Sequence, residues 1–131
     1  MIKKTELRRI ARARLWDAVA LYRAKRFDSA VYLCGYAIET ALKARICTTL
    51  KWPEFPSNTA EFRNYQSFRT HDLDVLLSLS GSEKKVKTRF LADWSVVAKW
   101  NPEARYGPIG ALTRRDAGLM IGSTKILLRV I

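Results

Sequence analysis

The chain has 131 residues, of which 48% are apolar and 27% are charged, with only 6 Gly and 4 Pro. This length is typical of one domain with one core, and the composition excludes disordered, collagen-like and low-complexity chains. The formal net charge of +12 gives the surface a positive field that favours anionic partners. We therefore expect residues 1–131 to form a single folded domain.

The first predicted element is an amphipathic helix from Thr5 to about Lys25. Basic residues strongly outnumber acidic ones over residues 1–26, and Arg8, Arg9 and Arg12 share the polar side of this helix. Repeated like charges on one face point to solvent or to a bound anion. The apolar side is expected to pack on the core, with residues that recur every three or four positions: Leu7, Ala11, Leu15, Ala18 and Tyr22.

A second helix is predicted from Asp28, as its cap, to about Thr49. Its apolar positions cover well over a third of its circumference, which is typical of the central helix of a bundle. Gly35 costs stability inside a helix, so we expect it to let another helix approach closely.

The cysteines and the chain ends bear on the cellular compartment. Cys34 and Cys47 lie in the same predicted helix, about 20 Å apart at 1.5 Å per residue, so they cannot pair in a disulfide. We expect two reduced thiols in the core. The N-terminus lacks an apolar signal segment, and the apolar stretch Leu119–Ile131 is short and interrupted by charges, so we expect no membrane association and a cytoplasmic location.

Three further helices are predicted after a connection at 51–70, whose scattered aromatic residues are expected to close one end of the bundle or to form a mobile loop. They span His71–Ser80, ending at Gly81, then about Ser82–Trp100 and Thr113–Arg129. No segment alternates as a strand would. The predicted fold is all-α, a single up-and-down bundle of about five helices.

Small residues in the last predicted helix suggest close packing there. Gly118 and Gly122 are one turn apart and are expected to form a notch against a neighbouring helix.

Most enzyme signatures are absent: there is no phosphate-binding glycine loop, dinucleotide fingerprint, zinc-protease helix or nucleophile elbow. No Cys and His cluster predicts a metal site, and no cofactor is expected. His71, the single histidine, is the one candidate general base, with a packing or capping role as the alternative.

Three segments carry a family resemblance. Residues 26–45, RFDSAVYLCGYAIETALKAR, combine an aromatic-Asp turn with an Ala-rich helix that ends in Glu, Leu and Lys. His71-Asp72-Leu73 opens the third predicted helix, and Trp100–Tyr106 precede the last one. In this order the segments resemble the HEPN family of small helical-bundle proteins over nearly the whole chain.

The resemblance implies a bacterial or archaeal bundle, commonly homodimeric, in stress, phage-defence or toxin-antitoxin settings, and often paired with a small nucleotidyltransferase. Many members are metal-independent RNases with an Arg, a polar residue and a His near the last long helices. Arg105 is the best positional match, but Tyr106-Gly107-Pro108-Ile109-Gly110 follows it without the polar residue or the His. The usual RNase motif is therefore missing.

Three functions stay open. The first is a module that binds RNA or a nucleotide and works with a nucleotidyltransferase or toxin-antitoxin partner, with Arg8, Arg9, Arg12, Arg105 and Tyr106 as binding candidates. The second is a metal-independent RNase toxin whose site forms at a dimer interface, with His71 and Arg105 as catalytic candidates. The third is a structural dimerisation or adaptor domain, for which the basic surface only maintains solubility.

Overall fold

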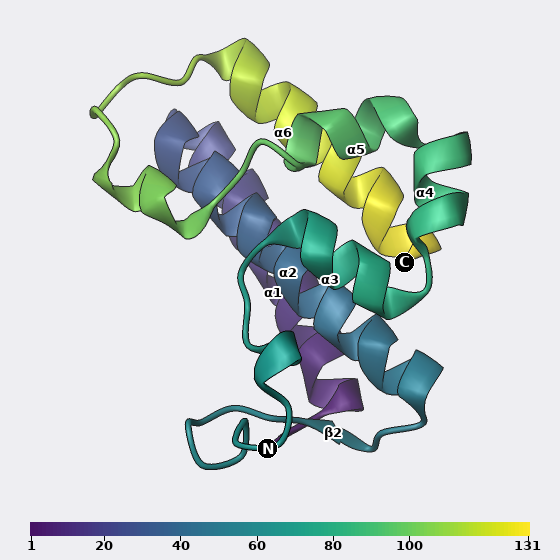
Figure 1. Cartoon of the computed structure of the whole chain (residues 1–131). Coiled ribbons are helices and arrows are strands. Elements are labelled where there is room, and N and C mark those ends of the chain that lie inside the picture. Colours follow the sequence, from purple (N-terminus) through teal and green to yellow (C-terminus); the bar gives the residue numbers. More distant parts are fainter.

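Long and short helices form two sides of a bundle around α2 in the computed structural model, which describes residues 1–131 (Figure 1). The long helices are α1 (Lys4–Arg23), α2 (Phe27–Leu50) and α6 (Arg114–Val130). The short ones are α3 (Leu73–Ser80), α4 (Glu83–Arg89) and α5 (Leu91–Val97), with 3-10 turns η1 (Gln66–Phe68) and η2 (Pro102–Tyr106). The all-α bundle predicted from the sequence is confirmed.

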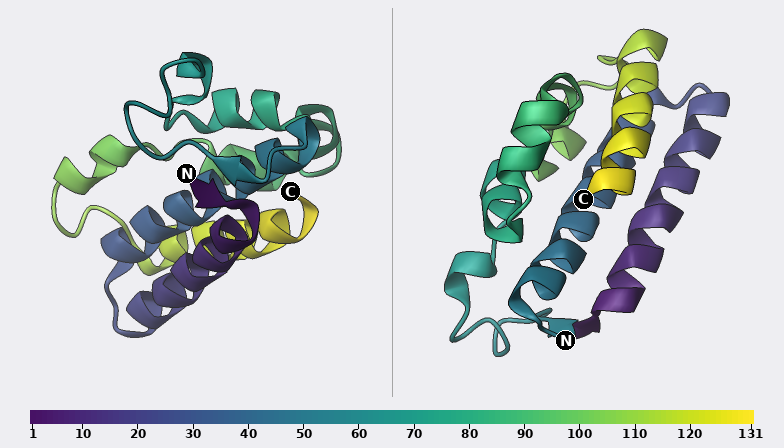
Figure 2. Two further views of the ribbon diagram at one scale, coloured as in Figure 1. Left: turned by 90° about the horizontal axis from the view of Figure 1, so that it is seen from below. Right: turned by 90° about the vertical axis from the view of Figure 1, so that its right-hand side faces the viewer.

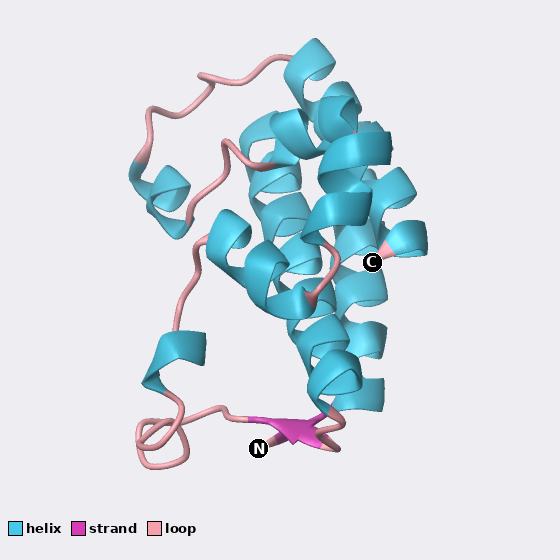
Figure 3. Ribbon diagram, turned by 45° about the vertical axis from the view of Figure 1, so that its right-hand side comes forward, coloured by secondary structure: helices cyan, strands magenta, loops and turns pink.

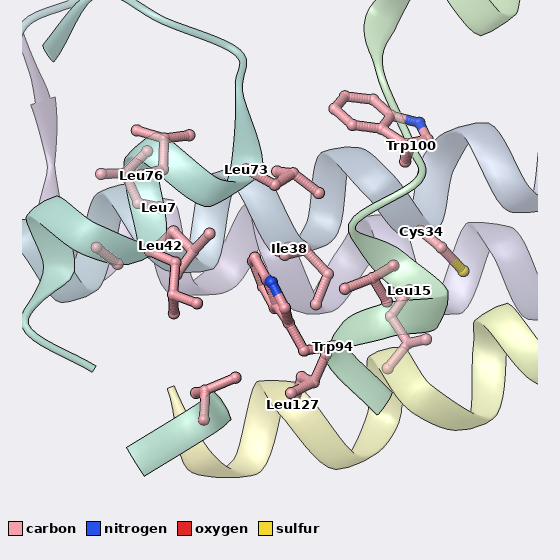
Figure 4. Close-up of a cluster of buried hydrophobic side chains, with 14 of the residues drawn as sticks. Leu7, Leu15, Cys34, Ile38, Leu42, Leu73, Leu76, Trp94, Trp100 and Leu127 are labelled. Atoms are coloured by element: carbon pink, nitrogen blue, oxygen red, sulfur yellow. The ribbon is translucent and has the colours of Figure 1, made fainter. Parts of the chain in front are cut away.

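Helix α2 is the centre of the fold. It contacts α1, α3 and α6, and its buried residues include Cys34, Ile38 and Leu42. Trp94 from α5 and Leu127 from α6 reach the same cluster (Figure 4). Burial of apolar side chains from every long helix supplies most of the stabilisation, at roughly 25 cal/mol per Å² of apolar surface.

Helix α6 covers only part of the α1–α2 hairpin. It begins in a capping box, in which the Thr113 side chain accepts from the Asp116 amide and the Asp116 carboxylate accepts from the Thr113 amide. It runs alongside α1 and stops partway along it (Figure 2, right). The lower turns of α1 and α2 therefore extend beyond the end of α6.

The fourth predicted helix is two helices. Instead of one helix over Ser82–Trp100, α4 ends at Arg89 and α5 begins at Leu91, and α5 ends at Val97. Phe90 between them leaves the helical conformation, with φ −130° and ψ 31°. The bend lets Val86 and Trp94 both reach the core, and no Gly or Pro marks it in the sequence.

Two predicted helix starts are corrected. Arg26, not Asp28, is the N-cap of α2, and the Asp28 carboxylate accepts instead from the amides of Gly110 at 2.6 Å and Leu112 at 3.0 Å. The third helix begins at Leu73 rather than His71, because the Asp72 side chain accepts from the Val75 amide and serves as the cap.

The glycines differ in part from expectation. Gly35 is a close-approach position, but its neighbour is the indole of Trp100 and not another helix: a Cβ at Gly35 would lie 2.0 Å from the ring. Gly118 faces the Tyr22 hydroxyl, whereas Gly122 faces open space. The predicted notch therefore exists only at Gly118.

Residues 51–70 close the lower end of the bundle with aromatic side chains. Trp52 packs against Phe55, Tyr65 and Phe68, and Phe55 packs against Phe62. The expectation that these aromatics plug the bundle is confirmed. An unpredicted antiparallel pair, β1 (Ile2–Lys3) with β2 (Glu54–Phe55), ties this segment to the N-terminus (Figure 3). None of the helices has the length and apolar character needed to cross a membrane.

Candidate nucleic-acid interface

A groove of about 680 Å³ lies where α1, α2 and the end of α6 meet. The small side chains of two helices leave this space open, because Ala11 on α1 and Ala41 on α2 both line the groove. Leu15 and Leu128 line it between the helices. Its volume lies within the range of small-ligand sites.

Five cations line this groove, which we call the basic groove: Arg8, Arg12, Arg45, Lys125 and Arg129. No Asp or Glu lines it, and none of the five forms an ion pair. The concentration of unpaired positive charge is the arrangement that phosphate groups satisfy.

Hydrogen bonds within the protein leave most of these donors free. Arg8 donates to the Thr48 hydroxyl at 3.0 Å. The Nε of Arg45 is buried and has no partner in the protein. A buried donor without a partner costs free energy, and no acceptor within the protein neutralises Arg45.

Trp16 lines the groove from α1, and 61% of its surface is exposed. It lies one helical turn from Arg12, so the ring and the guanidinium belong to the same side of α1. An exposed indole beside cations offers a stacking surface next to phosphate-binding groups.

Only two of the three arginines predicted as binding residues on α1 line the groove. Arg8 and Arg12 line it, as expected of an anion-binding face, but Arg9 does not and instead pairs with Glu6 at 3.1 Å. Arg45, Lys125 and Arg129 were missed, because they come from two other helices and only tertiary packing brings them beside α1. Their one signal in the sequence is basic character on helices whose other faces are apolar.

Arg105 lies elsewhere and lines a second cavity of about 630 Å³ between the start of α2 and the loop 104–112, whereas Tyr106 is not among its lining residues. The Arg105 guanidinium lies 4.8 Å from the centroid of the Tyr106 ring. Hydrogen bonds with the Tyr32 and Tyr106 hydroxyls raise the pKa of Arg105. Arg105 therefore contacts tyrosines and forms no ion pair that would hold the loop 104–112.

The loop beside this second cavity is held by Asp28, whose carboxylate accepts the two amide hydrogen bonds described above. Behind Arg105, the hydroxyls of Tyr32 and Tyr36 hydrogen-bond at 3.2 Å. This bond is the main reason that the pKa of Tyr36 is raised to about 12, with burial adding to it. The phenol therefore stays protonated at physiological pH.

His71 contacts the buried carboxylate of Glu39. Its Nδ1 lies 2.6 Å from Glu39 Oε1, and Lys43 Nζ lies 3.0 Å from the same oxygen. Glu39 is only 2% exposed, so this contact ties the segment before α3 to α2. His71 itself stays exposed, so its structural role is this one hydrogen bond to α2 rather than packing in the core, and the helix cap is Asp72.

The structure does not bring His71 and Arg105 together. His71 contacts α2 at Glu39, and Arg105 contacts it at Tyr32, seven residues and about 10 Å earlier along the helix axis. No cluster of three or more His, Cys, Asp or Glu side chains that could hold a metal ion is present.

The structure is thus an all-α bundle with a groove lined by basic side chains. The family model described as "HEPN domain" matches residues 5–131, and the chain belongs to that family. No curated protein and no solved structure gives a significant match to the chain.

Proposed function

We propose that this HEPN domain binds RNA or a nucleotide through the basic groove and lacks RNase activity of the usual Arg-polar-His type. The observation that carries the proposal is the set of five cations in one groove, with no Asp or Glu among its lining residues. The pairing of Arg9 with Glu6 marks the difference, because that arginine already has its anion. Arg9 and the pair Arg105–Tyr106 are therefore outside the proposed interface.

Phosphate contacts would give the binding a strong dependence on salt. If all five cations each neutralised one phosphate of a single strand, the slope of log K against log salt would be about −3.5. A partial set of contacts would give a proportionally smaller slope. The measured slope of log K against log salt therefore gives the number of phosphate contacts.

A partner protein completes the proposal. We place the domain, as a homodimer, beside a nucleotidyltransferase or within a toxin-antitoxin pair, with the RNA or nucleotide as the shared ligand. Metal-independent RNA cleavage has weaker support, because Arg105 is followed by Tyr106-Gly107-Pro108-Ile109-Gly110 without the polar residue and the His of the usual motif, and no single chain brings His71 to Arg105. A purely structural adaptor has no use for unpaired cations concentrated in a hollow.

The test is binding of a fluorescent RNA by two variants with the same net charge. The groove variant carries Arg12→Gln, Lys125→Gln and Arg129→Gln. The control variant removes three exposed cations from the α4–α5 side of the bundle: Lys84→Gln, Arg89→Gln and Lys99→Gln.

We expect the groove variant to lose at least tenfold in affinity and about 2 units of salt slope, since each single-strand contact is worth about 0.7. The control variant should keep the wild-type slope. Equal losses in both variants would show that only net charge matters and would refute the groove as the site. Incubation of the same RNA with EDTA also reports cleavage, which we expect to be absent.

A further inference from the structure

We infer that the ligand of the basic groove presents an unpaired base, which stacks on Trp16 while its phosphates lie along Arg12 and Arg8. This inference rests on the proposed function and names the class of ligand: a single-stranded segment or free nucleotide, not duplex RNA.

Trp16 differs from the other three tryptophans in having no structural task. Trp94 is buried and donates from Nε1 to Asp74 at 2.9 Å, whereas Trp52 and Trp100 pack against other aromatic rings. Trp16 has neither an aromatic partner nor a hydrogen bond, and 61% of it is exposed. Because this exposed indole lies in a groove lined by cations, it offers a flat apolar surface beside groups that can hold a phosphate.

The face of the Trp16 ring is also free of cations. Arginines lie over the rings of Phe62, Tyr106 and Tyr22, at 4.8 to 5.8 Å from their centroids. No such contact occupies Trp16, although Arg12 is one turn away on the same helix. The indole can therefore receive a planar group from outside the protein.

The helix spacing orders the two kinds of contact. Arg12 and Arg8 follow Trp16 at intervals of four residues, about 6 Å each, toward the start of α1. A base on the ring would thus have cations on one side of it, along the direction in which the groove continues between α1 and α2.

Stacking on one indole selects against a duplex. Bases in a duplex already stack on their neighbours, and the deep, narrow major groove of A-form RNA hides their edges from side chains. An unpaired base has a free face, and aromatic side chains stack on it with little regard to sequence. Cations alone would not make this distinction, because both forms carry phosphates.

The experiment compares Trp16→Ala and Trp16→Phe with the wild-type protein. Each is titrated with a twelve-residue single-stranded oligoadenylate, with a twelve-base-pair RNA duplex and with ATP, by fluorescence anisotropy or competition. We expect Trp16→Ala to lose about 5- to 150-fold in affinity for the single strand, the range for one stacked base, with an unchanged salt slope. Trp16→Phe should recover most of the loss, and duplex affinity should not change.

The affinities of the Trp16 variants and of the groove variant for these ligands test this inference separately from the proposed function on which it rests. Single-strand affinity that is unchanged in Trp16→Ala, but lost in the groove variant, would overturn the stacking and leave the function standing. Loss of single-strand and duplex affinity by the same factor would also overturn it. Tighter binding of the oligoadenylate than of ATP would identify a polynucleotide as the ligand, and the reverse a free nucleotide.

Sedimentation velocity provides the remaining check. If Trp16→Ala, in the absence of RNA, converts a dimer to a monomer, then a second copy of the chain covers the indole and the inference is wrong. An unchanged sedimentation coefficient supports a free ring.

Discussion

Replacing Gly35 with Ala should destabilise the protein even though Ala is the better helix former. The new Cβ would lie 2.0 Å from Trp100 Cε2 and 2.1 Å from Cδ2, where an ordinary contact needs at least 3.4 Å. The buried indole must therefore be displaced from its packing against Tyr36, whose ring centroid lies 5.1 Å away. Loss of a buried Trp costs about 3 to 5 kcal/mol, and Ala recovers about 1 kcal/mol of helix propensity.

We therefore expect Gly35→Ala to lower the free energy of unfolding by about 2 to 4 kcal/mol. Each kcal/mol lost should lower the Tm by roughly 3 to 5 °C. Urea denaturation followed by circular dichroism measures it. In a Trp100→Ala background the sign should reverse, because the obstacle is gone, and Gly35→Ala should add up to about 1 kcal/mol. Stabilisation by Gly35→Ala in the wild-type background would refute the packing argument.

The helix caps and a core thiol give three more predictions. Thr113→Ala should cost about 1 kcal/mol of stability by removing the capping box of α6, and a change below 0.3 kcal/mol in urea denaturation would contradict it. Lys51→Gly should stabilise by up to about 1 kcal/mol, since Lys51 ends α2 with a left-handed φ of 58°; a lower Tm would count against this. Burial raises the pKa of the Cys34 thiol from 9.0 to about 11, because the folded state favours the neutral thiol. The stability that comes from this preference is complete below pH 9 and is lost as the pH rises through 11. Cys34→Ala should flatten this alkaline decline in stability, and an identical pH profile would refute it.

The bundle could be predicted from the sequence because its long helices have local signals. Thr113 and Asp116 mark the start of α6, and the spacing of apolar residues marks α1 and α2. The break at Phe90 could not be predicted in this way, because no Gly or Pro marks it and the bend follows from packing α4 and α5 on the same core. The prediction that Asp28 caps α2 was wrong for a related reason, because its carboxylate accepts from loop amides more than eighty residues later in the chain.

The candidate site was only half visible in the sequence. Arg8 and Arg12 were found because a cationic face repeats along one helix, but the same rule also selected Arg9, which pairs with Glu6. Arg45 and Lys125 join the groove through the packing of α2 and α6 against α1, a long-range arrangement that periodicity within one helix does not encode. Side-chain type thus predicted a class of ligand, whereas the location of the site required the fold.

The most direct measurement of the central claim is to map ultraviolet cross-links between the wild-type protein and a single-stranded RNA by mass spectrometry. The basic groove predicts adducts within residues 8–16 and 125–131, reduced when Arg12, Lys125 and Arg129 are all changed to Gln. Adducts confined to 25–32 and 104–112 would place the ligand in the second cavity, beside Arg105, and would contradict the account.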